Sequence, residues 1–175
     1  MTRTVYYTAA SLDGFIATPD HSLDWLLTRR QEEGGALDYA TFIAGIGALA
    51  MGASTYRWIV DHVGDGTWDY DVPSWVFTHR DFPPRPDADI TFTADPVPQV
   101  HRAMVTAAGE RDVWLVGGGD LVGQFHDHGL LDDVLVSFAP VTLGAGMPLL
   151  PRHVELALRD VGRNGDLACA TYAVR

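Results

Sequence analysis

Lysine is absent from this 175-residue chain, whose twelve basic residues are all arginine. The chain therefore has no Walker-type phosphate lysine, no Schiff-base lysine and no lysine general base. It also contains a single cysteine, Cys169, which excludes an internal disulfide. Because Cys169 lies within the alternating run 167–174, we expect it to pack inside a strand rather than to act as a reactive thiol.

Long apolar runs are missing too, and none reaches the length that a membrane-spanning helix needs. The first residues show neither the charged nor the apolar segment of a secretion signal, so we expect a cytoplasmic protein without a membrane partner. A formal net charge of −11 argues against nucleic acid, which binds to basic surfaces. Length and a hydrophobic content of 47% suit one globular domain over residues 1–175.

Strand-like and helix-like patterns alternate through most of the chain. Strands are expected at residues 4–10, 48–51, 74–78, 90–93, 113–116 and 133–139, and helices at 38–46, 55–63, 97–108 and 121–128. Loops are expected at residues 11–20, 64–73, 82–89 and 140–151. Residues 154–174 form two alternating runs around Arg163-Asn164-Gly165-Asp166, which indicates a hairpin. The pattern predicts an α/β sheet with mostly parallel strands and a C-terminal antiparallel hairpin.

Three consecutive glycines, Gly117, Gly118 and Gly119, follow the strand at 113–116 directly. Residues without side chains let a ligand approach the main chain or let the chain adopt dihedrals closed to other residues. At the start of a helix this corner favours an anion, so we expect a phosphate or pyrophosphate. A tight strand-to-helix turn without a ligand is the alternative. With Gly123 the spacing is G-x-G-x-x-x-G, which is not the common dinucleotide fingerprint.

Two more corners follow other predicted strands. Gly52 to Thr55 starts a helix, where Ser54 or Thr55 can cap the helix and bind phosphate oxygens. Thr78-His79-Arg80 offers hydroxyl and basic groups suited to a ribose or its phosphate, with a solvated turn as an equal alternative. Because parallel strands end at one edge of a sheet, a long charged ligand can lie across these corners.

His126 and His128 are two residues apart in a predicted helix, so their side chains point to different faces. We expect them to be surface residues rather than metal ligands, and the sequence predicts no metal site.

Several segments then occur together in order: Ser11-Leu12-Asp13-Gly14-Phe15-Ile16-Ala17, Met51-Gly52-x-x-Thr55-Tyr56, Phe77-Thr78, Val116-Gly117-Gly118-Gly119 and Leu130 to Pro151. Together they resemble the dihydrofolate reductase superfamily, and more closely its branch similar to the reductase domain of bacterial riboflavin biosynthesis. The resemblance implies a mostly parallel eight-stranded central sheet with flanking helices. It also implies NADPH as hydride donor and a homodimer.

The same resemblance assigns cofactor contacts. It places the nicotinamide at Ala10, Leu12, Gly14 and Ile16. It places the adenosine half at Gly52, Ser54, Thr55, Thr78, His79 and Arg80. The pyrophosphate falls at Gly117, Gly118, Gly119, Asp120 and Leu121, just after Val116, with a cis peptide between Gly117 and Gly118.

Two positions depart from the family pattern. Ala53 stands where the family commonly has a phosphate-binding arginine after Met-Gly, so NADH is an alternative to NADPH and Arg80 a possible substitute. The acid that protonates pterins in dihydrofolate reductases falls at about Ala36, and the nearest carboxylate is Asp38. Folate reduction is therefore not expected.

The resemblance implies an NADPH-dependent reductase that transfers hydride to a C=N or C=O carbon of a small heterocyclic or riboflavin-precursor-like substrate. Asp13 or Asp38 is a candidate proton donor, although an Asx-turn that holds the loop is slightly favoured for Asp13. Trp25, Tyr39 and Phe42 are candidate walls of the substrate site, with core packing as the alternative for Phe42. A nucleotide-binding module without catalysis is the alternative function.

Overall fold

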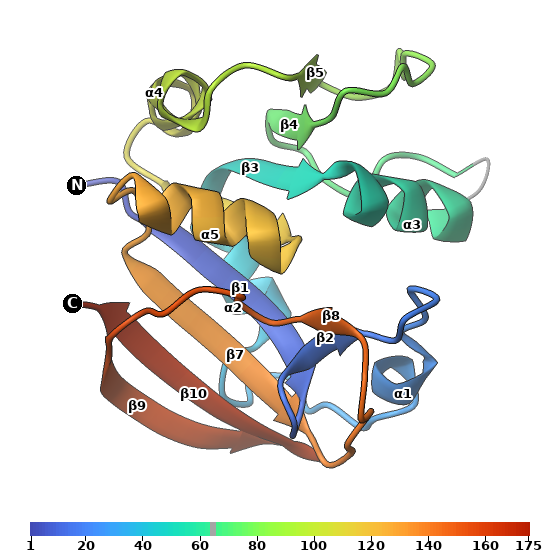
Figure 1. Cartoon of the computed structure of the whole chain (residues 1–175), viewed down its shortest axis with the longest axis vertical. Helices are drawn as coiled ribbons and strands as arrows, with labels where there is room; N and C mark the ends of the chain where they lie inside the picture. Colours follow the sequence, from blue (N-terminus) through green and yellow to red (C-terminus); the bar gives the residue numbers. More distant parts are fainter. Residues whose placement is uncertain (64–65) are drawn as a thin grey trace.

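The computed structural model describes residues 1–63 and 66–175 (Figure 1). Gly64 and Asp65, which begin the expected loop at 64–73, lie outside the described residues. The strands of the main sheet are β1 (Thr4–Ser11), β3 (Ile46–Gly52), β4 (Ser74–Phe77), β5 (Ile90–Thr93), β6 (Asp112–Gly117), β7 (Asp133–Ala139), β9 (Leu156–Asn164) and β10 (Leu167–Val174). A separate ribbon pairs β2 (Phe15–Ala17) with β8 (Met147–Pro148).

The eight-stranded sheet has the order β5-β4-β3-β6-β1-β7-β10-β9. All neighbours from β5 to β7 pair in parallel, and β10 runs antiparallel to both β7 and β9. The predicted α/β sheet with a C-terminal antiparallel hairpin is thus confirmed. The carboxyl ends of β1, β3, β4 and β6 consequently open on one edge.

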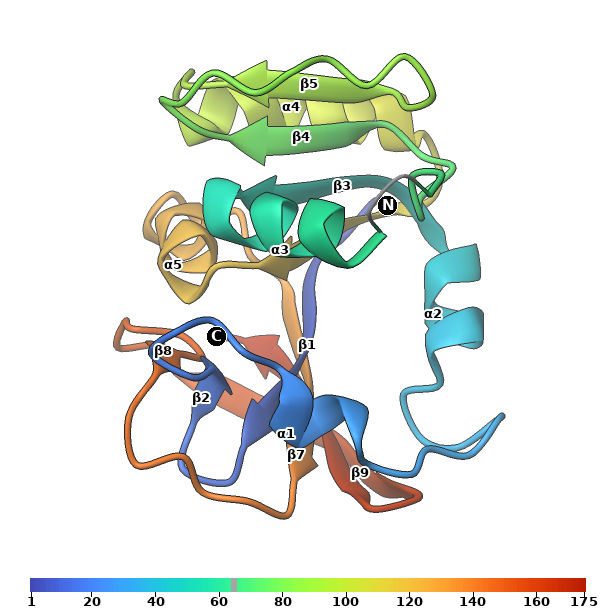
Figure 2. The same cartoon turned by 90° about the vertical axis from the view of Figure 1, so that its right-hand side faces the viewer.

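Helices cover both faces of the parallel half of the sheet. They are α1 (Asp24–Leu27), α2 (Tyr39–Ala44), α3 (Ala53–Val63), α4 (Val97–Ala108) and α5 (Gly119–Asp127). Figure 2 shows α3 in front of β3 and α4 behind β4 and β5. Within residues 1–63 and 66–175, every helix is too short or too polar to cross a bilayer.

The alternation along β3 explains the two layers. Ala48 and Ala50 belong to the core beneath α4 and α5, whereas Leu49 and Met51 belong to the core beneath α2 and α3. Small residues face α4, so this helix packs close to the strand. The side chains on the other face are large and fill the space beneath the shorter α2 and the start of α3.

The carboxylate of Asp13 joins two loops at the open edge of the sheet. It accepts a hydrogen bond from the hydroxyl of Ser11 at 2.6 Å and from the N–H groups of Leu143 and Gly144 at 3.0 and 2.7 Å. These bonds, led by that of Ser11, lower the pKa of Asp13 from 3.8 to about 2. Asp13 therefore ties the loop after β1 to the loop after β7.

Replacing Gly47 with alanine is expected to destabilise the fold. An added Cβ would lie 2.5 Å from the carbonyl oxygen of Ala108, a backbone atom of α4 that cannot swing aside. Overpacking of this kind costs about 1–3 kcal/mol, which urea unfolding would measure. Gly45→Ala is the matched control, since its Cβ would meet only Phe42 O at 3.5 Å. Equal stability of Gly47→Ala and the wild type would contradict the close packing of β3 and α4.

Asp13→Asn is expected to change how stability depends on pH. Because the folded-state pKa of Asp13 is depressed, its ionised form stabilises the fold above about pH 4, and this contribution is lost as pH falls through about 2. The Tm of the variant should therefore fall less steeply than that of the wild type between pH 4 and 2. Ser11→Ala removes the hydrogen bond that lowers the pKa of Asp13 most, so the loss of stability should begin at higher pH. Parallel Tm profiles of all three proteins would rule out this role of Asp13.

Candidate active site

The glycine corner joins β6 to α5, as the sequence predicts, but its peptide geometry differs from the expectation. No cis peptide occurs among residues 1–63 and 66–175, so the expected cis bond between Gly117 and Gly118 is wrong. The corner is turned by Gly118, whose φ of 94° and ψ of 91° are rarely adopted by residues with side chains. The chain therefore turns here through the backbone dihedrals of Gly118, with a trans peptide bond.

The flanking glycines are closely packed, and at Gly119 the neighbouring atoms are backbone. A Cβ on Gly117 would lie 3.1 Å from Oγ1 of Thr55, and a Cβ on Gly119 would lie 2.6 Å from the carbonyl oxygen of Leu149. The corner therefore packs against α3 on one side and against the chain that follows β8 on the other.

Two helix N-termini meet at this edge. α3 begins at Ala53, directly after β3, and α5 begins at Gly119. The unpaired N–H groups and the dipoles of both helices make the region favourable to anions. Asp120 in the first turn of α5 pairs with Arg152, whose Nη2 lies 3.0 Å from its Oδ1 and whose Nε also lies 3.1 Å from Oδ2 of Asp127.

Three adjoining cavities lie along the edge. The first, the helix-corner cavity, has a volume of about 350 Å³ and lies among the ends of β3, β4 and β5 and the start of α5. The second, the strap cavity, has a volume of about 260 Å³ and is covered by β2 and β8. The third, the aromatic pocket, has a volume of about 500 Å³ and is lined by Tyr7, Tyr39, Tyr70, Trp58 and Trp114 among others.

Shared lining residues connect these cavities into one cleft. Ser54 and Gly118 line both the helix-corner cavity and the strap cavity, whereas Ile16 and Trp58 line both the strap cavity and the aromatic pocket. Thr55 lines all three. The cleft thus runs from the end of β4 past both helix N-termini to the aromatic pocket.

Most of the expected cofactor residues line this cleft. The expected residues that line the helix-corner cavity are Gly52, Ser54, Thr55, Thr78, His79, Gly118, Asp120 and Leu121. Ile16 and Gly119 line the strap cavity, and Val116 and Gly117 line the aromatic pocket. Four do not line it. Ala10 is fully buried in β1, Leu12 is 68% exposed, and Gly14 turns the loop with a φ of 87°. Arg80 lines a neighbouring cavity.

That neighbouring cavity, of about 560 Å³, is termed the charged cavity. It contains two arginines, Arg57 and Arg80, and three carboxylates, those of Asp20, Asp24 and Asp61. Ser54, Leu23 and Trp58 also line it, so it adjoins the cleft on the α3 side.

The two candidate proton donors need correction. Asp13 is committed to the loop contacts described above, and Asp38 caps α2 by accepting hydrogen bonds from the N–H and hydroxyl of Thr41 at 3.0 and 2.9 Å. These bonds lower the pKa of Asp38 as well. Neither carboxylate lines the cleft, and the charge of each is held by hydrogen-bond donors of its own surroundings, so neither is placed to donate a proton there.

Of the three candidate aromatic walls, only Tyr39 lines the aromatic pocket. Trp25 packs on the core around Cys169 and donates its indole N–H to the carbonyl of Ser22 at 3.2 Å. Phe42 stacks on Tyr7 with ring centroids 4.0 Å apart, so it supports the pocket from behind. Trp25 is therefore a packing residue, and the core-packing alternative holds for Phe42.

Sequence reasoning missed the principal walls of the pocket. Trp114 of β6 donates its indole N–H to the carbonyl of Tyr7 at 3.0 Å, and Tyr70 meets Trp114 edge to face at 5.6 Å. Burial is the main cause that raises the pKa of Tyr7 to about 12 and also raises the pKa of Tyr39 and Tyr70. These phenols therefore stay neutral. The alternation of residues 4–10 contained a signal for Tyr7, but nothing local pointed to Tyr70.

Within the described ranges, no three His, Cys, Asp or Glu side chains are grouped so that they could hold a metal ion. His126 is half-buried and His128 exposed near the end of α5.

Comparison with known proteins gives the family. Residues 4–163 match the model of the RibD C-terminal domain. The Uncharacterized protein YwjB of Bacillus subtilis is 32% identical over 174 residues, which cover 97% of each chain. Among solved structures, the fold is similar to that of a putative riboflavin biosynthesis protein from Shewanella sp. PV-4, with a TM-score of 0.83, 22% identity and coverage of 99% of each chain.

A second solved structure is a diaminohydroxyphosphoribosylaminopyrimidine deaminase/5-amino-6-(5-phosphoribosylamino)uracil reductase from Thermotoga maritima. Its TM-score is 0.69 at 15% identity, and the match covers 99% of this chain and 57% of that one. The resemblance drawn from the sequence is thus confirmed. The chain belongs to the RibD C-terminal domain family, a family of reductase domains.

Proposed function

We propose that the protein is a reductase that uses a reduced nicotinamide dinucleotide to transfer hydride to a C=N or C=O carbon of a small heterocyclic or riboflavin-precursor-like substrate. The observation that carries this proposal is the single cleft that joins two helix N-termini to an aromatic pocket. A dinucleotide has the matching shape, because its charged pyrophosphate lies between two aromatic or sugar-bearing ends.

The residues along the cleft fit such a cofactor. The N–H groups at Gly118 to Leu121 and the hydroxyls of Ser54 and Thr55 would hold the pyrophosphate, Thr78 and His79 the adenosine half, and Ile16 with Val116 the nicotinamide. When bound, the cofactor supplies the hydride, and the protein supplies orientation and a site shielded from water.

NADPH is the proposed donor, with NADH as the alternative. Ala53 leaves the start of α3 without a cation of its own, but Arg57 and Arg80 line the charged cavity together with Ser54. A 2′-phosphate that reached this side of Ser54 would meet both guanidinium groups.

Reduction of C=N or C=O adds one hydride to carbon and one proton to the heteroatom. No carboxylate lines the aromatic pocket in the described chain, whereas the phenols of Tyr39 and Tyr70 do. Since burial raises the pKa of both, they remain hydrogen-bond donors at neutral pH. We propose that they orient the substrate heteroatom and that water supplies the proton at the exposed mouth beside Gln31.

Ser54→Asp is expected to weaken binding of NADPH and NADH by at least about tenfold. An acidic residue in the first turn suits the helix dipole, so α3 should remain intact, but the carboxylate would repel the pyrophosphate. Ser54→Asn is the control of equal size without charge. Isothermal calorimetry measures the affinities, and thermal unfolding checks the fold. Unchanged affinity in Ser54→Asp would place the phosphates elsewhere.

Turnover separates catalysis from mere binding. Loss of NADPH absorbance at 340 nm with a panel of carbonyl and imine heterocycles is the expected result. Tight binding without oxidation across the panel would instead favour a nucleotide-binding module, and absence of binding by both cofactors would refute both functions.

The buried free thiol of Cys169 suits work in a reducing compartment, and we propose the cytoplasm.

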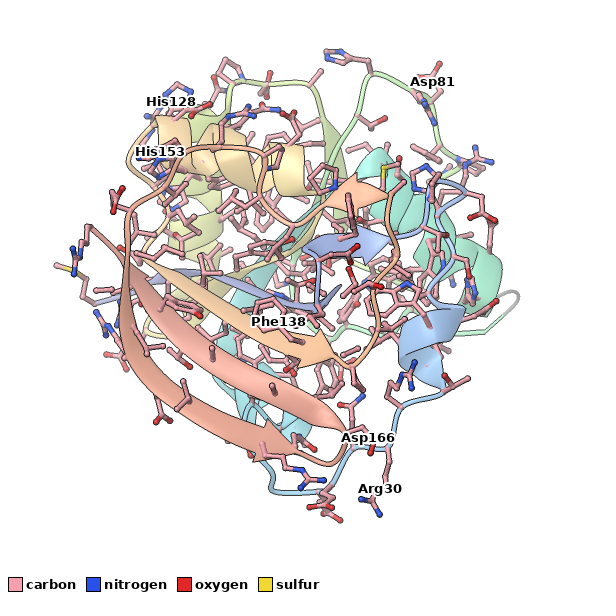
Figure 3. The ribbon with its side chains drawn as sticks, turned by 60° about the horizontal axis from the view of Figure 1, so that its bottom comes forward. Arg30, Asp81, His128, Phe138, His153 and Asp166 are labelled. Carbon is pink, nitrogen blue, oxygen red and sulfur yellow. The ribbon has the colours of Figure 1, made fainter. Side chains whose placement is uncertain are left out.

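We also propose a homodimer, formed through one face of β7, β10 and β9. Leu158 lies opposite Tyr172 and Val161 lies opposite Ala170, because a bulge in β9 leaves Arg159 without a partner in the register. Tyr172 and Ala170 are two residues apart in β10, so Leu158 and Val161 lie on the same face of the sheet. Both are exposed, at 59% and 66%. Phe138 lies on the same face, and Figure 3 shows no helix in front of these strands. An exposed apolar patch on the outer strand of a sheet favours a second copy.

Val161→Glu is expected to dissociate this dimer, because a carboxylate would be buried at the interface of two identical faces. Light scattering after gel filtration should give the 19.1 kDa of one chain for the variant and twice that mass for the wild type. Thr106→Glu adds the same charge on the exposed side of α4 and should leave the dimer unchanged. A wild type that is monomeric at 100 µM, or a dimeric Val161→Glu, would exclude this interface.

A further inference from the structure

The lining of the aromatic pocket carries no formal charge. Among the described residues that surround its volume of about 500 Å³ there is no arginine, histidine, aspartate or glutamate, and the chain has no lysine. The polar side-chain groups are hydroxyls, indole N–H groups and one amide. The hydroxyls belong to Tyr7, Thr8, Tyr39, Thr55, Tyr70 and Ser137, the indoles to Trp58 and Trp114, and the amide to Gln31. Resting on the proposed function, we propose that this pocket selects an uncharged, flat aromatic substrate and rejects one that carries a phosphate.

The walls are aromatic and arranged around Trp114. Tyr7, Tyr39 and Tyr70 meet its indole at centroid distances of 6.0, 6.1 and 5.6 Å and at steep interplanar angles. Ring faces carry partial negative charge, so they attract flat, electron-poor rings and repel anions. The shape and the electrostatics of the pocket favour the same kind of ligand.

The polar groups match the edge of a neutral heterocycle. Within the described chain, the phenols of Tyr39 and Tyr70 and the amide of Gln31 make no side-chain hydrogen bond to other protein groups, while Tyr7 donates its own to the carbonyl of Leu37 at 2.8 Å. Neutral donors of this kind pair with ring carbonyls and imine nitrogens. They cannot neutralise a phosphate, which carries a charge of about −1.5 to −2 at pH 7.

Three arginines that lie close in sequence to lining residues, Arg29, Arg30 and Arg163, have their side chains elsewhere. Arg29 donates to the carbonyl of Trp25, and Arg163 donates to the carbonyl of Gly165. Arg30 stands next to Gln31 but extends from the edge of the molecule near Asp166 (Figure 3), where its side chain is 67% exposed. Since the lining itself contains no arginine, no guanidinium group borders the pocket in the part of the chain that the structure describes.

The charged cavity does not supply the cation that the aromatic pocket lacks. It lies beyond Leu23 and Trp58, and three carboxylates line it together with its two arginines. On the proposed function, those arginines also serve the cofactor. A substrate phosphate would therefore stay in a neutral pocket inside a protein of net charge −11, where a buried anion without a partner is strongly disfavoured. The Thermotoga relative, by its name, reduces a phosphoribosyl compound, so the two proteins would differ in substrate class.

Matched ligand pairs test this inference. We would titrate 6-hydroxymethylpterin against pterin-6-carboxylate, and pyridoxal against pyridoxal 5′-phosphate, into the protein saturated with NADP⁺, using calorimetry. Each uncharged member is expected to bind at least about tenfold more tightly than its anionic partner. The difference should persist in 0.5 M NaCl, where the long-range effect of net charge is screened.

Gln31→Arg places a cation at the exposed mouth of the pocket and should reduce the difference to about threefold or less. Thr106→Arg adds the same charge on α4 and should leave the difference as it is in the wild type. Together the two variants separate the pocket lining from the overall charge of the protein.

Three outcomes would overturn the inference. They are equal or tighter binding of the anionic members, loss of the difference in 0.5 M NaCl, and failure of both uncharged probes while NADP⁺ still binds. Tight binding of pyridoxal 5′-phosphate that is abolished by Arg57→Gln would show that the charged cavity receives a substrate phosphate. If the protein binds no nicotinamide dinucleotide but keeps the preference for uncharged rings, the proposed function fails and the pocket selectivity stands.

Discussion

The close approach of the chain after β8 to Gly119 is the contact on which the cleft depends. No side chain fits between Gly119 and the carbonyl of Leu149, and Leu149 is fixed from both sides. Its N–H donates to the carbonyl of Gly14 at 2.9 Å, and its own carbonyl accepts the hydroxyl of Tyr6 at 3.0 Å. The β2 and β8 ribbon is thereby held above the helix N-termini. Without it the strap cavity would be an open surface.

The parallel sheet could be predicted because its signals are local. Apolar runs bounded by glycine and proline gave the strands, and residues 90–93, 97–108 and 133–139 were placed at the bounds that the structure has. The β2 and β8 pairing has no such signal, because it joins segments about 130 residues apart through two or three residues each. The sequence indicates where the glycine corner lies but not its geometry. Gly118 makes the turn with a positive φ, so the expected cis peptide is not needed.

The pocket was the hardest part to foresee, for a related reason. Carboxylates stand out in a sequence, and Asp13 and Asp38 are candidate proton donors for that reason. In the structure both accept hydrogen bonds from backbone N–H groups instead. Tyr7, Tyr70 and Trp114 look like core residues in any linear pattern. They become a binding surface only because β1, β6 and the loop before β4 bring them together around a space that no side chain fills.

Trp58 has an unusual position in this arrangement. Its indole borders the strap cavity, the aromatic pocket and the charged cavity, and it stacks on His62 with centroids 3.7 Å apart. Whatever enters any of the three spaces must alter the surroundings of one chromophore. The molecule therefore contains an intrinsic optical reporter of its own occupancy, whose emission changes with solvent contact and ring stacking.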